Sequence, residues 1–180
     1  QARVAVLITD NAEAGAVRIA QPAGVAAAVI QPRPASAGEK FTAELLAALQ
    51  SHRANFIVLS GYVRKIPDPV IQAYRGRAIN IHPALLPSFG GKGMYGRHVH
   101  EAVLSYGCKI SGATVHFVDE EYDAGAPILQ RGVAVLDDDT ADTLDARDLE
   151  IEHQILPEAL RLFAGDRGRI GGRGTMIEGG

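Results

Sequence analysis

Cysteine, tryptophan and long apolar runs are scarce or absent in this 180-residue sequence. It contains one cysteine, Cys108, and no tryptophan. A single cysteine forms no internal disulfide and supplies no cysteine-rich zinc site. The longest apolar runs, such as Val4–Ile8, are far shorter than the roughly 20 residues that span a bilayer. We therefore expect neither a disulfide scaffold nor a membrane partner, and no secretory signal peptide is recognisable.

Positive charge is not in excess either. The chain has 18 lysines and arginines against 21 aspartates and glutamates, a net charge of −3. A nucleic-acid partner is therefore not expected. Hydrophobic residues make up 47% and charged residues 22%, which is typical of a globular chain. We expect a cytoplasmic protein with one domain at residues 1–164, followed by a Gly-rich tail or weak hairpin at 165–180.

Strand and helix patterns alternate along the first half of the chain. Apolar runs rich in β-branched residues predict buried strands, and amphipathic or alanine-rich runs predict helices. The expected strands are 3–8, 25–30, 55–59 and 77–81, and the expected helices are 12–21, 39–53 and 68–74. This alternation predicts βαβ units and hence an α/β fold with a doubly wound, mostly parallel sheet.

The pattern changes after residue 81. The expected elements are a Pro/Gly-rich loop at 82–96, a helix at 97–106, strands at 111–118 and 127–136, and a long helix at 141–164. The eight-residue link 119–126 is too short for a crossover helix and suits an antiparallel pair. Acidic residues just before 141 favour a helix start there. We therefore expect the C-terminal part of the sheet to be antiparallel.

A candidate catalytic group lies at the end of the strand 77–81. Ligands of open α/β sheets bind beyond the carboxyl ends of the strands. Asn80 and His82 are two residues apart on the strand and so point to one face. An amide donor beside an imidazole suits a developing oxyanion and proton transfer. Asp123 is the expected orienting carboxylate, which would raise the pKa of His82. Alternatively, His82 bonds only its own loop and Asp123 supports a turn.

Other polar motifs carry weaker signals. His98 and His100 lie two apart in an expected helix, which is the wrong spacing for a shared metal. We expect them to cap or pack, with one of them at the edge of the site. Gly90–Gly96 resembles a phosphate-binding loop but lacks the preceding strand, so a mobile loop over a site is favoured. The acidic residues from Asp137 through Glu152 are expected to form mostly a solvated face, and no metal site is expected.

Four motifs follow one another in the chain. They are Asn80–Pro87, His98–His100, Ser111–Val118 and Asp123–Gln130. In this order they closely resemble the folate-dependent phosphoribosylglycinamide formyltransferases of purine biosynthesis, and the resemblance extends from residue 3 to about residue 163. It implies a Rossmann-like fold and transfer of a formyl group from 10-formyltetrahydrofolate to the amine of glycinamide ribonucleotide. The amine itself would be the nucleophile.

The resemblance also implies roles for individual residues. Asn80 would donate a hydrogen bond to the tetrahedral oxyanion, His82 would stabilise it as an imidazolium, and Asp123 would hold His82 and a water. Pro83 and Glu152 would contact the substrate. The folate would contact Val63, Arg64, Lys65, Ile66, Asp119, Glu120 and Glu121.

The sequence departs from the family pattern at its start. Members of the family open with a further strand, a Gly-Ser-Asn-type phosphate-binding loop and a helix. This sequence begins at what resembles the second strand, so we expect the first strand and helix to be missing from it or to lie upstream of Gln1. Two alternative functions stay open: hydrolysis of formyltetrahydrofolate, and a catalytically silent folate-binding domain. The expected partners are small molecules, and the expected assembly is a monomer or homodimer.

Overall fold

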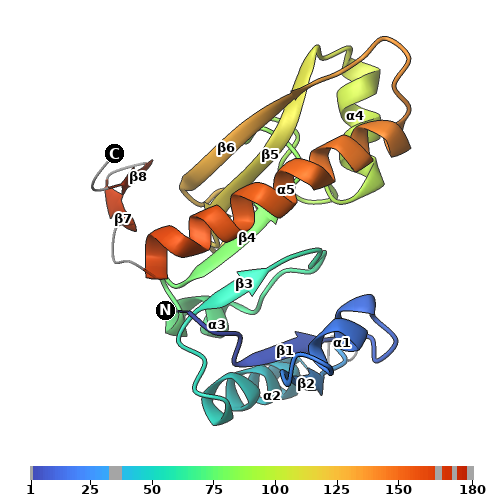
Figure 1. The fold of residues 1–180 in the computed structure, drawn as a ribbon. Helices are drawn as coiled ribbons and strands as arrows, with labels where there is room; N and C mark the ends of the chain where they lie inside the picture. The colour runs from blue at the N-terminus through green and yellow to red at the C-terminus, as the bar shows by residue number, and fades with distance from the viewer. Residues whose placement is uncertain (1, 33–37, 165–167, 172–173, 178–180) are drawn as a thin grey trace. The chain divides into compact units, whose positions relative to one another are not determined.

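The computed structural model describes residues 2–32, 38–164, 168–171 and 174–177 (Figure 1). Contacts divide the chain into two compact units. The smaller unit contains residues 2–57 and 66–74, and the larger unit contains residues 58–65 and 75–180. The three residues predicted to be catalytic, Asn80, His82 and Asp123, all belong to the larger unit.

The smaller unit begins with a βαβ arrangement. Its elements are β1 (Val6–Thr9), α1 (Gly15–Ala20) and β2 (Ala26–Val29). The two strands pair in parallel, as predicted. The prediction that the first strand is buried on both faces is wrong, because all four of its residues are only partly buried. Within the described residues β1 pairs with β2 alone, and the short helix α1 covers little of their surface.

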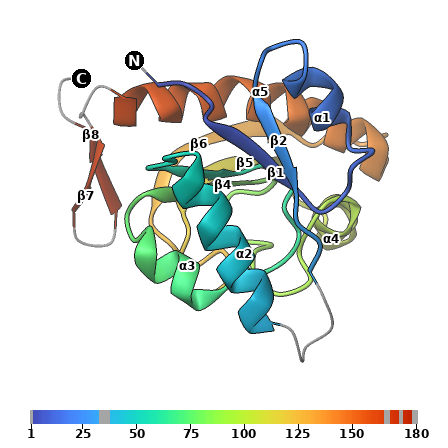
Figure 2. The same cartoon turned by 90° about the horizontal axis from the view of Figure 1, so that it is seen from below.

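Two helices complete the smaller unit. They are α2 (Gly38–Ser51) and α3 (Asp68–Ala73). α2 buries Leu45 and Leu49, one turn apart on its predicted apolar face. α3 lies beside α2 (Figure 2). The hydroxyl of Tyr74, just after α3, donates a 2.9 Å hydrogen bond to the carbonyl of Ala54, which fixes the turn that follows α2.

The second sheet, all of whose residues except Ile57 belong to the larger unit, has four strands in the order β3-β4-β5-β6. They are β3 (Ile57–Leu59), β4 (Ala78–His82), β5 (Ile110–Phe117) and β6 (Pro127–Ala134). β5 pairs antiparallel with both β4 and β6, which confirms the predicted α/β fold with an antiparallel C-terminal part. Every residue of β5 after Ile110 is buried. The polar residues on this strand therefore lie inside the protein rather than on a solvated face.

Two helices pack against each other and against this sheet. They are α4 (Arg97–Tyr106) and α5 (Ala141–Ala164), and α5 also contacts β5 and β6 (Figure 1). Ala84, Val99, Val103 and Leu144 form a buried apolar cluster that joins the segment after β4 to both helices. Cys108, predicted to be a small buried hydrophobe, is partly buried against this cluster. The segment that follows β4 is thus packed directly onto α4 and α5.

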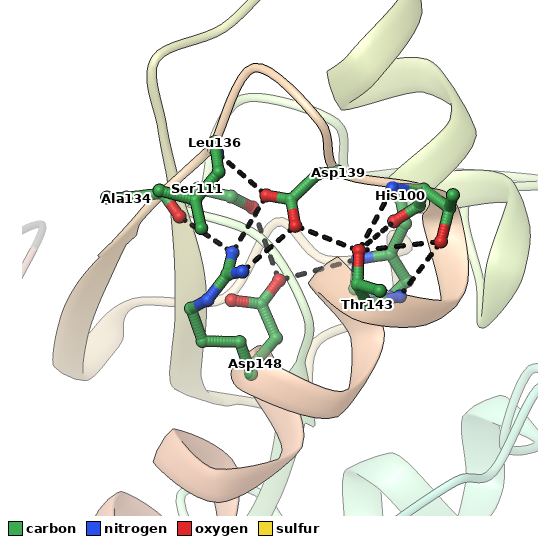
Figure 3. Close-up of polar contacts among 9 residues, drawn as sticks. His100, Ser111, Ala134, Leu136, Asp139, Thr143 and Asp148 are labelled. Carbon is green, nitrogen blue, oxygen red and sulfur yellow. Dashed lines mark hydrogen bonds and ion pairs between the residues drawn. The ribbon is translucent and has the colours of Figure 1, made fainter.

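The start of α5 is held by polar contacts. The Thr143 N–H donates to the Thr140 hydroxyl at 3.2 Å, which caps the first turn. The guanidinium of Arg147 donates to both carboxylate oxygens of Asp139, at 2.8 and 2.9 Å (Figure 3). The same guanidinium donates to the carbonyl of Ala134 at 2.9 Å. These bonds fix the first two turns of α5 to the end of β6.

The last described residues form a short antiparallel pair, β7 (Gly168–Gly171) and β8 (Gly174–Ile177). The pair lies within the segment 165–180, which was predicted as a Gly-rich tail or weak hairpin. The other residues of the predicted tail, 165–167, 172–173 and 178–180, lie outside the described residues. The predicted domain boundary at 164 stays a prediction. Within the described ranges, no helix combines the length and the apolar character needed to cross a membrane.

Candidate active site

The pairing of β4 with β5 brings polar side chains to one face of the sheet. Asn80 lies opposite His116, and His82 lies opposite Thr114. Cross-strand partners share a face, as do residues two apart on a strand. These four side chains therefore lie on the same face. His82, Thr114 and His116 are buried there, with at most 3% of their surface exposed.

Asp123 joins this group from the loop between β5 and β6. One of its oxygens, Oδ2, lies 3.6 Å from Nδ1 of His82, and the other lies 3.5 Å from Nε2 of His116. The backbone N–H of Gly91 donates to Oδ2 at 2.8 Å. The structure therefore brings the predicted residues Asn80, His82 and Asp123 into one cluster. Their catalytic roles remain a proposal.

His116 was not among the predicted site residues, although it links them. Its Nδ1–H donates to the carbonyl of Phe117 at 2.8 Å, which leaves Nε2 as an acceptor. The side-chain amide of Asn80 donates to that nitrogen at 3.1 Å. An amide has two N–H groups, so one remains available to a ligand. The polar alternation of Thr114 and His116 was the sequence signal that could have identified this residue.

Both ring nitrogens of His82 face oxygen atoms. Nε2–H donates to the carbonyl of Phe89 at 2.8 Å, and Nδ1 faces Asp123. Only an imidazolium could donate to both partners at once. The two alternatives drawn from the sequence, a bond to its own loop and a pairing with Asp123, therefore occur together.

The predicted rise in the pKa of His82 is wrong. Burial lowers the pKa of His82 below its ordinary value of 6.5 and outweighs the opposing effects of Asp123 and the Phe89 carbonyl. His116 and His100 lower it further. Burial on its own raises the pKa of Asp123, but its contacts with His116, Gly91 and His82 lower it overall. At neutral pH the site thus holds a neutral His82 imidazole beside an ionised carboxylate.

A second set of hydrogen bonds fixes the segment that follows His82. The Thr114 hydroxyl donates to the carbonyl of Ala84 at 2.6 Å and accepts from the N–H of Leu86 at 3.1 Å. Gln130 donates to the carbonyl of Leu86 at 2.9 Å. This network fixes the backbone around Pro83, the residue that follows the candidate histidine His82. Contact between Pro83 and a substrate stays a prediction.

The residues predicted to bind folate lie in three places. Val63, Arg64 and Lys65 are exposed in the larger unit, whereas Ile66 is buried in the smaller unit. The three acidic residues lie on the same loop as Asp123. They are Asp119, Glu120 and Glu121. Glu120 forms an ion pair with Arg75, a residue that the sequence did not single out. Folate contacts by all seven residues stay predictions.

Glu152, the predicted substrate-contacting acid, lies on α5 and is partly buried. Burial raises the pKa of its carboxyl to about 7, and the negative charges of Asp148 and Asp145 add to the rise. His100 acts in the opposite direction. The predicted solvated acidic face is wrong at Asp148, which is completely buried one turn before Glu152. Asp148 is buried because α4 packs against α5, and only a helix face that no other element covers can be solvated.

The remaining motifs occupy simpler positions. The loop Gly90–Gly96 contacts the site through Gly91, and a Cβ on Gly90 would lie 2.5 Å from the Leu86 side chain and 3.2 Å from Asp123. Glycine at position 90 therefore permits the loop to approach Asp123 closely. His98 is exposed, whereas His100 is completely buried. In the described part of the chain, no three His, Cys, Asp or Glu side chains are arranged to hold a metal ion.

The comparison with known families identifies the class. The Formyl transferase family model matches residues 1–160. The match covers most of the chain, so the protein belongs to the formyl transferase family.

Individual relatives show which members of this family the chain resembles. The chain is 40% identical over 164 residues to a chloroplastic phosphoribosylglycinamide formyltransferase of Vigna unguiculata, with 91% of this chain and 53% of that protein covered. A solved glycinamide ribonucleotide transformylase 1 from Symbiobacterium toebii matches with a TM-score of 0.89 and 41% identity, over 97% of this chain and 80% of that one. A formyltetrahydrofolate deformylase from Pseudomonas syringae pv. tomato matches with a TM-score of 0.87 and 26% identity, over 97% of this chain and 56% of that one. The chain spans about half the length of the plant relatives it matches.

Proposed function

We propose that this protein transfers a formyl group from 10-formyltetrahydrofolate to the amine of glycinamide ribonucleotide, a step of purine biosynthesis. The observation that carries the proposal is the grouping of Asn80, His82 and Asp123 on one face of the sheet, with His116 between Asn80 and Asp123. Its relatives at 40 and 41% identity bear the name of this activity. Formyl transfer needs hydrogen-bond donors for an oxyanion and a group that moves a proton, and the cluster supplies both.

The reaction is an acyl transfer through a tetrahedral intermediate. The lone pair of the substrate amine forms a bond to the formyl carbon, and the carbonyl π electrons move to the oxygen. The free N–H of the Asn80 side chain donates to that oxyanion. When the intermediate collapses, the bond between the formyl carbon and N10 of the folate breaks. The amine proton passes to N10, so that tetrahydrofolate leaves neutral at that atom.

His82 responds to the charge that develops in this step. The imidazole is neutral in the resting protein because it is buried. A negative oxygen beside it favours the imidazolium, which already has acceptors on both sides in Asp123 and Phe89. In the imidazolium both ring nitrogens carry hydrogens that Asp123 and the Phe89 carbonyl accept, and the positive ring stabilises the oxyanion. The amine proton is transferred to N10 as the intermediate collapses.

The binding residues complete the proposal. Asp119, Glu120 and Glu121 share the loop of Asp123 and would contact the folate, together with Val63–Ile66. Pro83 and Glu152 would contact the substrate that carries the amine. The Glu152 carboxyl, with a pKa of about 7, is close to half ionised at neutral pH and so can accept a hydrogen bond from that amine.

Hydrolysis of formyltetrahydrofolate is the second candidate, because a deformylase shares the fold at a TM-score of 0.87. In that reaction water replaces the amine and formate is released. The lower identity to that enzyme, 26% against 41%, favours formyl transfer. The cytoplasmic location and the monomeric or dimeric state remain predictions, and one plant relative is named as chloroplastic.

An assay of products separates these activities. The protein is incubated with 10-formyltetrahydrofolate, with and without glycinamide ribonucleotide, and both formylated amine and free formate are measured. We expect formylated amine that depends on the ribonucleotide. The His82→Ala variant should lose about 100-fold or more of this activity, the usual scale for removing an oxyanion partner.

The matched control for this assay is His52→Ala, which changes a histidine just after α2 in the smaller unit. Its activity should stay within about twofold of the original, because His52 is not a member of the cluster around His82. Release of formate without formylated amine would show that the protein hydrolyses formyltetrahydrofolate instead of transferring the formyl group. If neither formylated amine nor formate is formed, the protein is a catalytically silent domain. Full activity in His82→Ala would contradict the proposed role of that residue.

A further inference from the structure

The chain segment that follows His82 returns to the side chain of that residue. The Nε2–H of His82 donates to the carbonyl of Phe89, seven residues later, at 2.8 Å. Two residues further on, the N–H of Gly91 donates to Asp123 at 2.8 Å. The main chain of 83–91 thus supplies one polar group to each of these two side chains. A residue that fixes the course of this segment therefore also fixes their surroundings.

Thr114 holds the first half of the segment. It lies on β5 opposite His82 and has no exposed surface. A hydroxyl can donate one hydrogen bond and accept two. The Thr114 hydroxyl donates to the carbonyl of Ala84 at 2.6 Å and accepts from the N–H of Leu86 at 3.1 Å. It also accepts from the side-chain amide of Gln130 at 3.0 Å, so all three of its bonds are made. The same amide donates to the carbonyl of Leu86 at 2.9 Å.

Leu86 connects this first half to the second. The residue is buried, and a Cβ placed on Gly90 would lie 2.5 Å from its side chain and 3.2 Å from Asp123. There is thus no spare room between Leu86, Gly90 and Asp123. Between them the N–H of Ser88 donates to the carbonyl of Leu85 at 3.1 Å and closes a turn. A displacement of Leu86 is therefore passed on to the part of the loop that contacts Asp123.

The backbone of Phe89 needs support from outside the loop. Its φ is 53°, in the left-handed region that residues with a side chain seldom adopt. Such a conformation persists only where the surrounding structure holds it. The ring of Phe89 packs against the buried apolar cluster and edge-on against Tyr106, with 6.1 Å between ring centroids. The direction of its carbonyl thus depends on this ring contact and on the segment that precedes it.

We propose that Thr114 is a positioning residue of the active site, whose hydroxyl acts together with Gln130 to hold the segment 84–86. Held in this way, the segment places the Phe89 carbonyl at Nε2 of His82. The effect on rate rests on the function proposed above, whereas the effect on the imidazole does not. Thr114 acts through the main chain and the ring, and it has no need to touch the substrate.

The kinetic test replaces the hydroxyl and then restores it. Thr114→Val keeps the shape of the side chain and removes all three hydrogen bonds. We expect kcat to fall about tenfold or more, with both KM values within about threefold, because a misplaced catalytic group slows the reaction more than it weakens binding. Thr114→Ser should recover most of the rate. In a His82→Ala background Thr114→Val should cause no further loss, because the two residues act as one unit.

A second measurement needs no turnover. Hydrogen exchange of the His82 ring Nε2–H is followed by NMR of the nitrogen-labelled protein, and the signal is assigned by its absence in His82→Ala. In Thr114→Val this proton should exchange at least about tenfold faster, because the Phe89 carbonyl no longer stays in place. A protein without formyl transfer would refute the proposed function, yet the exchange rate would still decide this proposal.

Thr143→Val is the matched control. This exposed residue at the start of α5 also loses a hydroxyl bond, 2.8 Å long, to Asp139. Its kcat should stay within about twofold of the original, with the exchange rate unchanged. If Thr114→Val does not fold, Gln130→Leu, at an exposed position, removes two of the bonds and should lower kcat about threefold and speed the exchange.

Three results would overturn the proposal. The first is an unchanged exchange rate of the His82 ring proton in the folded variant, Thr114→Val or Gln130→Leu. The second is a rate in Thr114→Ser no better than that in Thr114→Val. The third is an equal loss from Thr114→Val with and without His82, which would show that Thr114 acts on the fold rather than through that ring.

Discussion

At the scale of single residues, Glu152 differs most from its ordinary chemistry. Its pKa is raised from 4.5 to about 7, with burial as the main cause. The folded protein therefore retains this proton over a pH range in which the unfolded chain releases it. The stabilisation that follows is fully present below pH 4.5 and is lost as pH rises through 7.

The variant Glu152→Gln tests this linkage. At pH 8 it should be more stable than the original protein by about 1–2 kcal/mol, a value reduced for the partial exposure of the side chain. At pH 5 the difference should nearly vanish, because Glu152 is then neutral in the folded protein. Urea unfolding at both pH values measures the change. The control Glu150→Gln, at an exposed neighbouring position, should show no such dependence. An equal gain at pH 5 and pH 8 would contradict the raised pKa.

At the scale of elements, the turn between β5 and β6 depends on Gly125. A Cβ at this position would lie 1.8 Å from the carbonyl oxygen of Phe117 and 2.7 Å from its carbonyl carbon. Both are backbone atoms of β5, so neither can move aside cheaply. The close approach of this loop to β5 therefore requires glycine, and it holds Asp123 two residues away.

Gly125→Ala should destabilise the protein by about 3 kcal/mol, at the upper end of the cost of overpacking. Formyl transfer should also fall, because the carboxylate of Asp123 is displaced from His82. Thermal unfolding and the product assay measure the two effects. Gly15→Ala is the control, since nothing lies within 4 Å of a Cβ there and alanine favours the helix α1. A melting temperature of Gly125→Ala equal to that of the control would show that the turn can relax.

Comparison of the elements with the sequence shows which features are local. β4 and the pair Asn80 and His82 were predictable, because an apolar run and a two-residue spacing lie within one strand. His116 was not assigned to the site, because its place depends on the register of β5 against β4, a contact between distant segments. The burial of Asp148 depends likewise on how α4 packs on α5. The direction of the His82 pKa shift depends on burial, which no single motif encodes.

At the scale of the whole molecule, the ring nitrogens of the two site histidines already face other groups. His116 uses both ring nitrogens, one toward Phe117 and one toward Asn80, and Phe89 and Asp123 face those of His82. We therefore expect formyl transfer to need no metal ion. Activity should persist at its full level after dialysis against a chelator. Loss of activity that zinc or another divalent ion restores would contradict this expectation, and a known zinc enzyme treated in parallel serves as the control.

The bond between His82 and the carbonyl of Phe89 has a consequence for ligand binding. A carbonyl that approaches Nε2 of His82 does not find an empty position, since the main chain already offers an oxygen of the same chemical type at 2.8 Å. Binding there is an exchange of one carbonyl for another, and such an exchange gains almost no net hydrogen-bond energy. In the resting protein the Phe89 carbonyl thus competes weakly with a ligand oxygen for Nε2 of His82. Only a ligand whose oxygen becomes more negative than an amide oxygen gains from the exchange, so this position discriminates in favour of the transition state over the ground state.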